Sequence, residues 1–234
     1  ARPLPGTEGA DRSAAIWSAD SRFIVYGTRG GLRRVGLDGT PPLPIEGPGG
    51  RAGGSWSATG TVIVGSRAGI LQVPEGGGTP TPLTRDASDT TREDHVAPWF
   101  LPDGRHFVYL RASTDATRQG IWVGRTDTSP DAQPQERLFS SSSAAVFAPA
   151  TDGESPEHLI FEREGVLLAQ PFNADTLTLT GDALRLETGV TPGDDAFGRR
   201  YGVSNTGLLV FRRGEARADT ARLVWHDRSG RPAG

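Results

Sequence analysis

Residues 95–110 read His95-Val96-Ala97-Pro98-Trp99-Phe100-Leu101-Pro102-Asp103-Gly104-Arg105-His106-Phe107-Val108-Tyr109-Leu110, and they predict two β-strands joined by a tight turn. Residues 96–101 are apolar and aromatic, which is typical of a strand. Proline presets φ, aspartate accepts backbone N–H groups and glycine tolerates positive φ, so residues 102–104 have the composition of a turn. A second β-prone run begins at Phe107. The stretch therefore predicts a β-hairpin.

The same hairpin pattern recurs along the chain. Further copies lie at residues 17–26, 56–64 and 201–211, and a weaker copy with a longer turn spans 146–161. Another short β-prone run follows each copy, at residues 32–35, 70–73, 121–123, 167–172 and 223–225. We therefore expect five inner hairpins, at about residues 15–26, 55–64, 96–110, 145–161 and 201–212.

The spacing of the copies predicts the architecture. Equivalent positions in the five return strands lie 38, 45, 52 and 50 residues apart, at Tyr26, Val64, Tyr109, Phe161 and Phe211. This period matches one blade of a β-propeller. We predict an all-β fold, a β-propeller with about five blades of four antiparallel strands and almost no helix. A β-sandwich with unrelated hairpins is the alternative.

The two ends of the chain suggest an incomplete propeller. Residues 2–4 resemble the outer-strand segments 81–83 and 136–139, and residues 223–225 resemble a third strand. We expect residues 1–234 to form one β-propeller domain, a fragment of a larger propeller that is incomplete at both ends. An open arc of this kind leaves a sheet edge exposed, so the isolated chain is expected to aggregate or dimerise.

The repeat resembles that of TolB-like β-propellers, and more narrowly the propeller of bacterial transmembrane serine/threonine kinases. The residues that carry the resemblance are 4–10 with Trp17-Ser18, 95–109, 159–172 and 223–230. The chain departs from the usual repeat at Ala19 and Ser21 in the first turn and at Thr59 in the second. The resemblance implies the sensor region of a membrane-anchored kinase, with an extracytoplasmic location expected and a cytoplasmic one left open.

Composition excludes several chemistries. The chain has no Cys, and all 25 of its basic residues are Arg. Cysteine catalysis, thiolate metal sites and the lysines of ATP-binding or Schiff-base sites are therefore absent. The net charge of −3 gives no field that favours nucleic acid or an anionic membrane, so neither is expected as a partner of this segment. Residues 47–54 are Gly-rich, but their spacing is not that of a phosphate-binding fingerprint.

We expect no catalytic residue, no cofactor and no metal site within the chain. No Gly-x-Ser-x-Gly sequence occurs, and the four histidines have no recognisable Ser and Asp partners. Glu93, Asp94 and His95 are consecutive, and adjacent side chains do not easily converge on one ion. Asp20, Asp103 and Gly104 are interpreted as structural turn residues. Trp17, Trp56 and Trp99 are expected to share one register and to pack between blades.

The candidate function is binding. Links into the inner strands share one face of a propeller, and loops on a rigid scaffold are where function is expected. The candidate residues for a protein or small-molecule ligand on that face are Arg51, Glu93, Asp94, His95, Asp194, Asp195, Arg199 and Arg200. The leading hypothesis is a non-catalytic sensor or docking scaffold of a kinase. The alternative is the gating propeller of an α/β-hydrolase peptidase whose activity lies in another domain.

Overall fold

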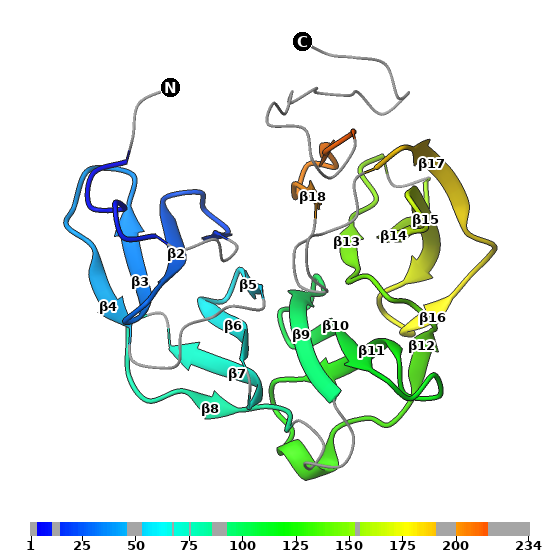
Figure 1. Ribbon diagram of the computed structural model, residues 1–234, viewed down its shortest axis with the longest axis horizontal. Helices are drawn as coiled ribbons and strands as arrows, with labels where there is room; N and C mark the ends of the chain where they lie inside the picture. Colours follow the sequence, from blue (N-terminus) through cyan, green and yellow to red (C-terminus); the bar gives the residue numbers. More distant parts are fainter. Residues whose placement is uncertain are drawn as a thin grey trace.

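The computed structural model describes residues 4–10, 15–45, 53–66, 68–74, 76–85, 93–152, 155–190 and 200–214. Within them, five antiparallel β-sheets follow one another around an arc, as Figure 1 shows. The N-terminal sheet and strand β18 lie at the two ends of this arc. The arrangement confirms the predicted β-propeller fold, in which each sheet is one blade.

The first three blades each contain four strands that pair in chain order. Blade 1 consists of β1 (Ile16–Trp17), β2 (Phe23–Thr28), β3 (Gly31–Gly36) and β4 (Leu43–Ile45). Blade 2 consists of β5 (Gly54–Trp56), β6 (Thr61–Ser66), β7 (Gly69–Pro74) and β8 (Thr81–Pro82). Blade 3 consists of β9 (Glu93–Phe100), β10 (His106–Ser113), β11 (Gly120–Arg125) and β12 (Arg137–Phe139).

The last two blades depart from this pattern. Blade 4 contains β13 (Val146–Ala148), β14 (Glu157–Arg163) and β15 (Val166–Asn173), and its outer position is divided between β16 (Thr178–Leu179) and β17 (Leu184–Thr188), which both pair with β15. Blade 5 shows β18 (Tyr201–Val203) and β19 (Leu209–Phe211). The third strand expected at residues 223–225 and the outer strand expected at residues 2–4 fall wholly or mainly outside the described residues.

The described residues contain almost no helix, as predicted. One 3₁₀ turn, η1 (Pro130–Ala132), is the helical element found in that part of the chain. A helix with the length and apolar character to cross a membrane is not found among the described residues. The extent of the domain, residues 1–234, stays a prediction.

One hairpin turn is repeated in four blades. In blade 3, the N–H of Leu101, which follows β9, donates to the carbonyl of His106 at the start of β10. The carbonyl of Leu101 in turn accepts the N–H of the residue three positions later, and the equivalent residues of the other three blades form the same two bonds. That third residue takes a positive φ of 58° to 85° each time; it is Ser21, Gly60, Gly104 and Gly207 in the four blades. Positive φ is the conformation that favours glycine. Ser21, one of the departures in the first turn, adopts it without being glycine.

The turn carboxylates accept hydrogen bonds from the backbone. Oδ1 of Asp103 accepts the N–H groups of Arg105 at 3.0 Å and His106 at 2.9 Å, and Oδ2 lies 2.5 Å from Nδ1 of His106. Oδ1 of Asp20 accepts the N–H of Arg22 at 3.0 Å and the hydroxyl of Ser18 at 2.6 Å. Both carboxylates therefore satisfy N–H groups that the tight turn leaves without a backbone partner.

Apolar side chains fill the spaces between neighbouring blades. Trp56 of blade 2 packs with Ile16 and Val25 of blade 1. Between blades 2 and 3, Phe100 packs against Ile63 and Ile70. Between blades 3 and 4, Phe161 packs against Val108 and Leu110. Between blades 4 and 5, Val203 packs against Ile160 and Leu167. The core of the protein is thus a series of inter-blade layers.

The expected register of the tryptophans is wrong in one blade. The residue just before the repeated turn is Trp17, Trp56, Phe100 and Val203 in the four blades, so Phe100 holds the position that was assigned to Trp99. Trp56, Phe100 and Val203 are each less than 10% exposed because the preceding blade covers them, whereas Trp17 of blade 1 is 52% exposed. The residues equivalent to Trp17 pack between blades, but Trp17 has no blade before it among the described residues.

Because Trp56 is buried and Trp17 is half-exposed, replacing each with alanine should lower the free energy of unfolding by different amounts. Trp56→Ala removes a buried ring and should lower the free energy of unfolding by about 3–5 kcal/mol. Trp17→Ala removes a half-exposed ring and should cost less than about 1 kcal/mol. Urea unfolding of the two variants measures both values. Equal costs would mean that Trp17 is covered in solution.

A second prediction concerns the turn in blade 3. Asp103→Ala removes an acceptor for two backbone N–H groups and should cost about 1–2 kcal/mol near neutral pH. Asp182→Ala is the control, because Asp182 is exposed and its side chain forms no hydrogen bond with any of the described residues. Burial alone raises the pKa of Asp103, but bonds from His106 and Arg105 outweigh it and hold the pKa below its ordinary value.

The lowered pKa of Asp103 determines how its contribution to stability changes with pH. A carboxyl whose pKa is lowered by folding stabilises the protein above its unfolded pKa of about 3.9, and this contribution is lost as the pH falls through the folded value. The stability difference between wild type and Asp103→Ala should therefore narrow below about pH 4. A difference that is constant with pH would contradict this role of the carboxylate.

Candidate functional site

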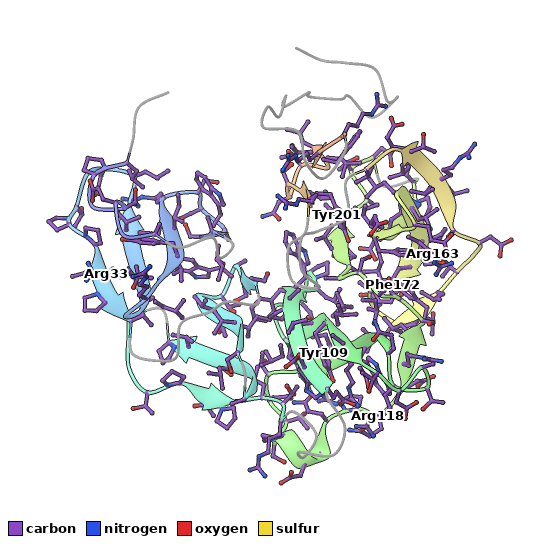
Figure 2. All side chains as sticks on the ribbon, viewed as in Figure 1. Arg33, Tyr109, Arg118, Arg163, Phe172 and Tyr201 are labelled. Atoms are coloured by element: carbon purple, nitrogen blue, oxygen red, sulfur yellow. The ribbon has the colours of Figure 1, made fainter. Side chains whose placement is uncertain are left out.

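The charged side chains of interest lie at one end of blade 3. Strands of a blade alternate in direction, so the link into each innermost strand shares an end with the turn between the second and third strands. We call this end of the arc the linker face, and the end with the repeated turns the hairpin face. In blade 3 the linker face carries the start of β9, the end of β10 and the loop of residues 114–119. Figure 2 labels Tyr109 and Arg118 in this blade.

Strand periodicity brings Glu93 and His95 together. Side chains two residues apart point to the same side of a strand, so Glu93 and His95 share a side while Asp94 points to the other. Nε2 of His95 lies 2.9 Å from Oε1 of Glu93, and the two side chains are 4% and 1% exposed, respectively. Asp94 is exposed. Glu93 and His95 are therefore buried within the blade, whereas the sequence predicted that they lie on a link of the binding face.

Arg118 completes the pairing of the Glu93 carboxylate. Its Nε donates to Oε2 of Glu93 and its Nη2 donates to Oε1 at 3.0 Å, which is a two-pronged guanidinium–carboxylate bond. The Arg118 side chain is 40% exposed although its partner is buried. The carboxylate thus anchors a guanidinium that reaches the surface.

Arg111 lies beneath this pair. It is directly opposite His95 in the register of β9 and β10, and its side chain is 4% exposed. Its Nε and Nη2 donate to the hydroxyl of Tyr109 at 3.1 and 3.0 Å, and its guanidinium carbon lies 3.8 Å from the centre of the Trp122 ring. Its Nη1 is 3.9 Å from Oε1 of Glu93. Aromatic and hydroxyl groups therefore hold most of this buried cation.

We call this group the Glu93 cluster; it consists of Glu93, His95, Tyr109, Arg111, Arg118 and Trp122. Tyr109 and Trp122 also pack with Ile63 and Ile70 of blade 2, so the cluster lies on the side of blade 3 that faces blade 2. It forms the polar end of an otherwise apolar layer between the two blades.

Burial sets the protonation states in the cluster. Loss of solvent lowers the pKa of His95 to about 4, against the opposing effect of its bond to Glu93, so its ring is neutral near pH 7. Burial alone raises the pKa of Glu93, but bonds from Arg118 and His95 outweigh it and keep the carboxyl ionised. Burial raises the pKa of the Tyr109 hydroxyl. With one carboxylate and two guanidinium groups, the cluster carries a net positive charge.

The remaining candidate residues are not part of this cluster. Arg200 belongs to blade 5, just before β18, and is half-buried. Four of the candidates lie outside the described residues: Arg51, Asp194, Asp195 and Arg199. No three His, Cys, Asp or Glu side chains in the described ranges come together as a group that could hold a metal ion. The ligand-binding role of the candidate set stays a prediction.

Sequence reasoning missed Arg111 and Arg118. A signal for Arg111 was present, since an arginine continues the alternation Phe107, Tyr109, Arg111 on a side where a third apolar residue is expected. No local signal pointed to Arg118, because its partner Glu93 lies 25 residues earlier in the chain. Only the pairing of β9 with β10 brings these residues to one place.

Comparisons with known proteins identify the fold without a family. No protein-family model and no curated protein matches the chain. Among solved structures, a calcium-binding protein, regucalcin, from Agrobacterium tumefaciens superposes with a TM-score of 0.63 at 14% identity, over 95% of this chain and 72% of that one. A gluconolactonase from Xanthomonas campestris gives 0.60 at 14% identity, over 94% and 73%.

Two further structures are similar at comparable identity. A proposed 6-phosphogluconolactonase from Bacteroides fragilis superposes with a TM-score of 0.56 at 16% identity, over 98% of this chain and 71% of that one. A puromycin-hydrolysing peptidase from Mycobacterium tuberculosis gives 0.58 at 13% identity, over 97% of this chain but 47% of that one. These likenesses support the propeller fold.

The comparisons contradict the expectation that the chain is not an enzyme. Structures named as a gluconolactonase and as a proposed 6-phosphogluconolactonase share this fold, so the fold is one that enzymes use. The reasoning from sequence was too broad. The absence of Lys, Cys and a nucleophile elbow removes amine, thiol and α/β-hydrolase chemistry, but it leaves hydrolysis by carboxylates, histidines or a bound metal open.

The buried histidine predicts a pH-dependent stability. A neutral His with a folded pKa of about 4 resists protonation that the unfolded chain accepts at about 6.5, so stability is full above pH 6.5 and falls as the pH drops toward 4. The loss should reach up to about 3 kcal/mol, and His95→Gln should remove it. Unfolding in urea at a series of pH values measures both slopes.

His158→Gln is the comparison, because burial also lowers the pKa of His158 and gives a loss of the same sign. The difference between wild type and each variant cancels the contribution of carboxyl groups that do not contact the substituted histidine. A pH slope that is unchanged in His95→Gln would show that His95 is not kept neutral by the fold.

Proposed function

We propose that the chain is the ligand-binding propeller of a membrane-anchored bacterial serine/threonine kinase and that it contacts its partner through the linker face. The sequence resemblance of residues 4–10 with 17–18, 95–109, 159–172 and 223–230 to the propellers of such kinases supports the context. The observation that carries the binding role is the Glu93 cluster, in which a buried carboxylate holds Arg118 at the surface of the linker face. We propose a protein or small molecule as the partner.

Rigid placement of charge supports recognition. Side chains that are fixed before a partner arrives lose less conformational entropy on binding than free ones do. Arg118 is fixed by two hydrogen bonds, and Asp94 lies exposed on the edge of the same strand as Glu93. The proposed location is extracytoplasmic, on the resemblance to the kinase propellers.

A second candidate is the propeller of a larger hydrolase. The observation in its favour is the match to the mycobacterial peptidase, which covers 97% of this chain and 47% of that one, so a propeller of this size occurs within a longer hydrolytic protein. In this candidate the linker face would border a neighbouring hydrolytic part instead of a signalling partner.

The two candidates differ in what the complete gene product does. Membranes that contain the complete protein should incorporate labelled phosphate from ATP, and Asp94→Arg should change that incorporation several-fold because it reverses charge on the linker face. Asp182→Arg is the matched control, an exposed acid in blade 4 next to β17. A complete protein that hydrolyses a peptide or a lactone and incorporates no phosphate would overturn the kinase proposal.

A further inference from the structure

Arg118 has a second hydrogen-bonding edge that the Glu93 carboxylate does not use. A guanidinium has five N–H groups, arranged as a side edge formed by Nε with Nη2 and an end edge formed by Nη1 with Nη2. Glu93 takes the side edge through Nε and Nη2. No residue in the described part of the chain accepts a bond from Nη1, and 40% of the side chain is exposed. The end edge of this part-exposed side chain is therefore unused within the described part of the chain.

We propose that the end edge of Arg118 is a binding site for a carboxylate group on the linker face. Two parallel N–H donors match the two oxygens of a carboxylate, which is the geometry that Glu93 already shows on the other edge. The ligand class is a small carboxylic acid or a carboxylate side chain of a peptide. This inference deepens the proposed binding role and rests on it only for its biological meaning, because the site itself can be tested with free carboxylates.

The loop that carries Arg118 is held in one conformation. The carbonyl of Asp115 accepts the N–H groups of Arg118 at 3.0 Å and Gln119 at 2.9 Å. The indole N–H of Trp122 donates to the carbonyl of Arg118 at 3.0 Å, and Nη1 of Arg137 donates to the carbonyl of Ala116 at 2.8 Å. A site whose backbone and side chain are fixed in advance binds with a smaller entropic cost.

Charge in the cluster favours an anion at this edge. Arg111 is buried and its bonds at normal length go to the neutral Tyr109 hydroxyl, so one positive charge in the cluster is left without a matching carboxylate. Asp94 points to the other side of β9, away from the cluster. Asp115, on the same loop, opposes an incoming anion, but it is exposed and its Oδ1 is bonded to the N–H and hydroxyl of Thr117. Water screens its charge more than that of a buried group.

Titration of the full chain with sodium acetate tests the proposal. The Nε–H resonance of Arg118 should shift along a saturable curve with acetate but not with sodium chloride at equal ionic strength. Arg118→Lys keeps the charge opposite Glu93 but loses the planar edge, so it should weaken acetate binding by about tenfold. Arg105→Lys is the matched control, because Arg105 pairs with Asp127 on the hairpin face and is 48% exposed; it should leave the affinity unchanged.

Three results would overturn the site. They are a chloride titration with the same curve, an Arg118→Lys variant with wild-type affinity, and tighter binding of inorganic phosphate than of acetate. If Arg118→Lys does not fold, Asp115→Asn keeps the proposal testable, because it leaves the Arg118–Glu93 pair intact and should tighten acetate binding. If the complete protein binds acetate but has no kinase activity, the carboxylate site at Arg118 is supported and the proposed kinase function is wrong. The experiment therefore distinguishes failure of the site from failure of the function.

Discussion

Blades 2, 3 and 4 each have two apolar faces, and a neighbouring sheet covers each face. In blade 3, Phe107 and Tyr109 pack toward blade 2, while Val108 and Leu110 pack toward blade 4. Burial of apolar surface stabilises a fold by roughly 25 cal/mol per Å², so a neighbour on each side stabilises a sheet that has two such faces. This requirement explains why the return strands are continuous apolar runs and why the blades follow one another in an arc.

The Glu93 cluster is an exception within these apolar layers. A buried carboxylate costs several kcal/mol unless its charge and its lone pairs find partners. Here both oxygens of Glu93 accept hydrogen bonds from Arg118, and Oε1 also contacts His95. The arrangement satisfies the buried charge, and it has a second consequence. Because Arg118 is tied to a group in the interior, the linker face carries a guanidinium with a fixed position and direction.

The fold alone does not identify the chemistry of the chain. Structures named as a calcium-binding protein, as lactonases and as a peptidase all superpose on it at 13–16% identity. A propeller supplies a rigid ring of loops, and the residues on those loops determine what is bound or transformed. In the described part of this chain, the cluster at the linker end of blade 3 is one place where such residues are charged, fixed and anchored in the interior. Its side chains suit recognition of a polar group.

The sequence by itself determined the local elements. Hairpin turns depend on residues a few positions apart, so the Pro102-Asp103-Gly104 turn and its relatives were predictable, as were the inner hairpins and the third strands up to blade 4. The blade architecture followed from their period. Trp99 was misplaced by one residue because the tryptophan itself served as the landmark. The turn aspartate gives the correct register, since Asp20 lies three residues after Trp17 and Asp103 lies three residues after Phe100.

Only the tertiary structure decided which charged residues meet. Glu93, Arg111 and Arg118 are separated by up to 25 residues, and the register of β9 with β10 brings them together. The burial of Glu93 and His95 depends on blade 2, which lies earlier in the chain. The exposure of Trp17 depends on its place at the end of the arc, although its local sequence is that of the buried Trp56. Local propensity fixes strands and turns, whereas burial and charge pairing depend on what packs against them.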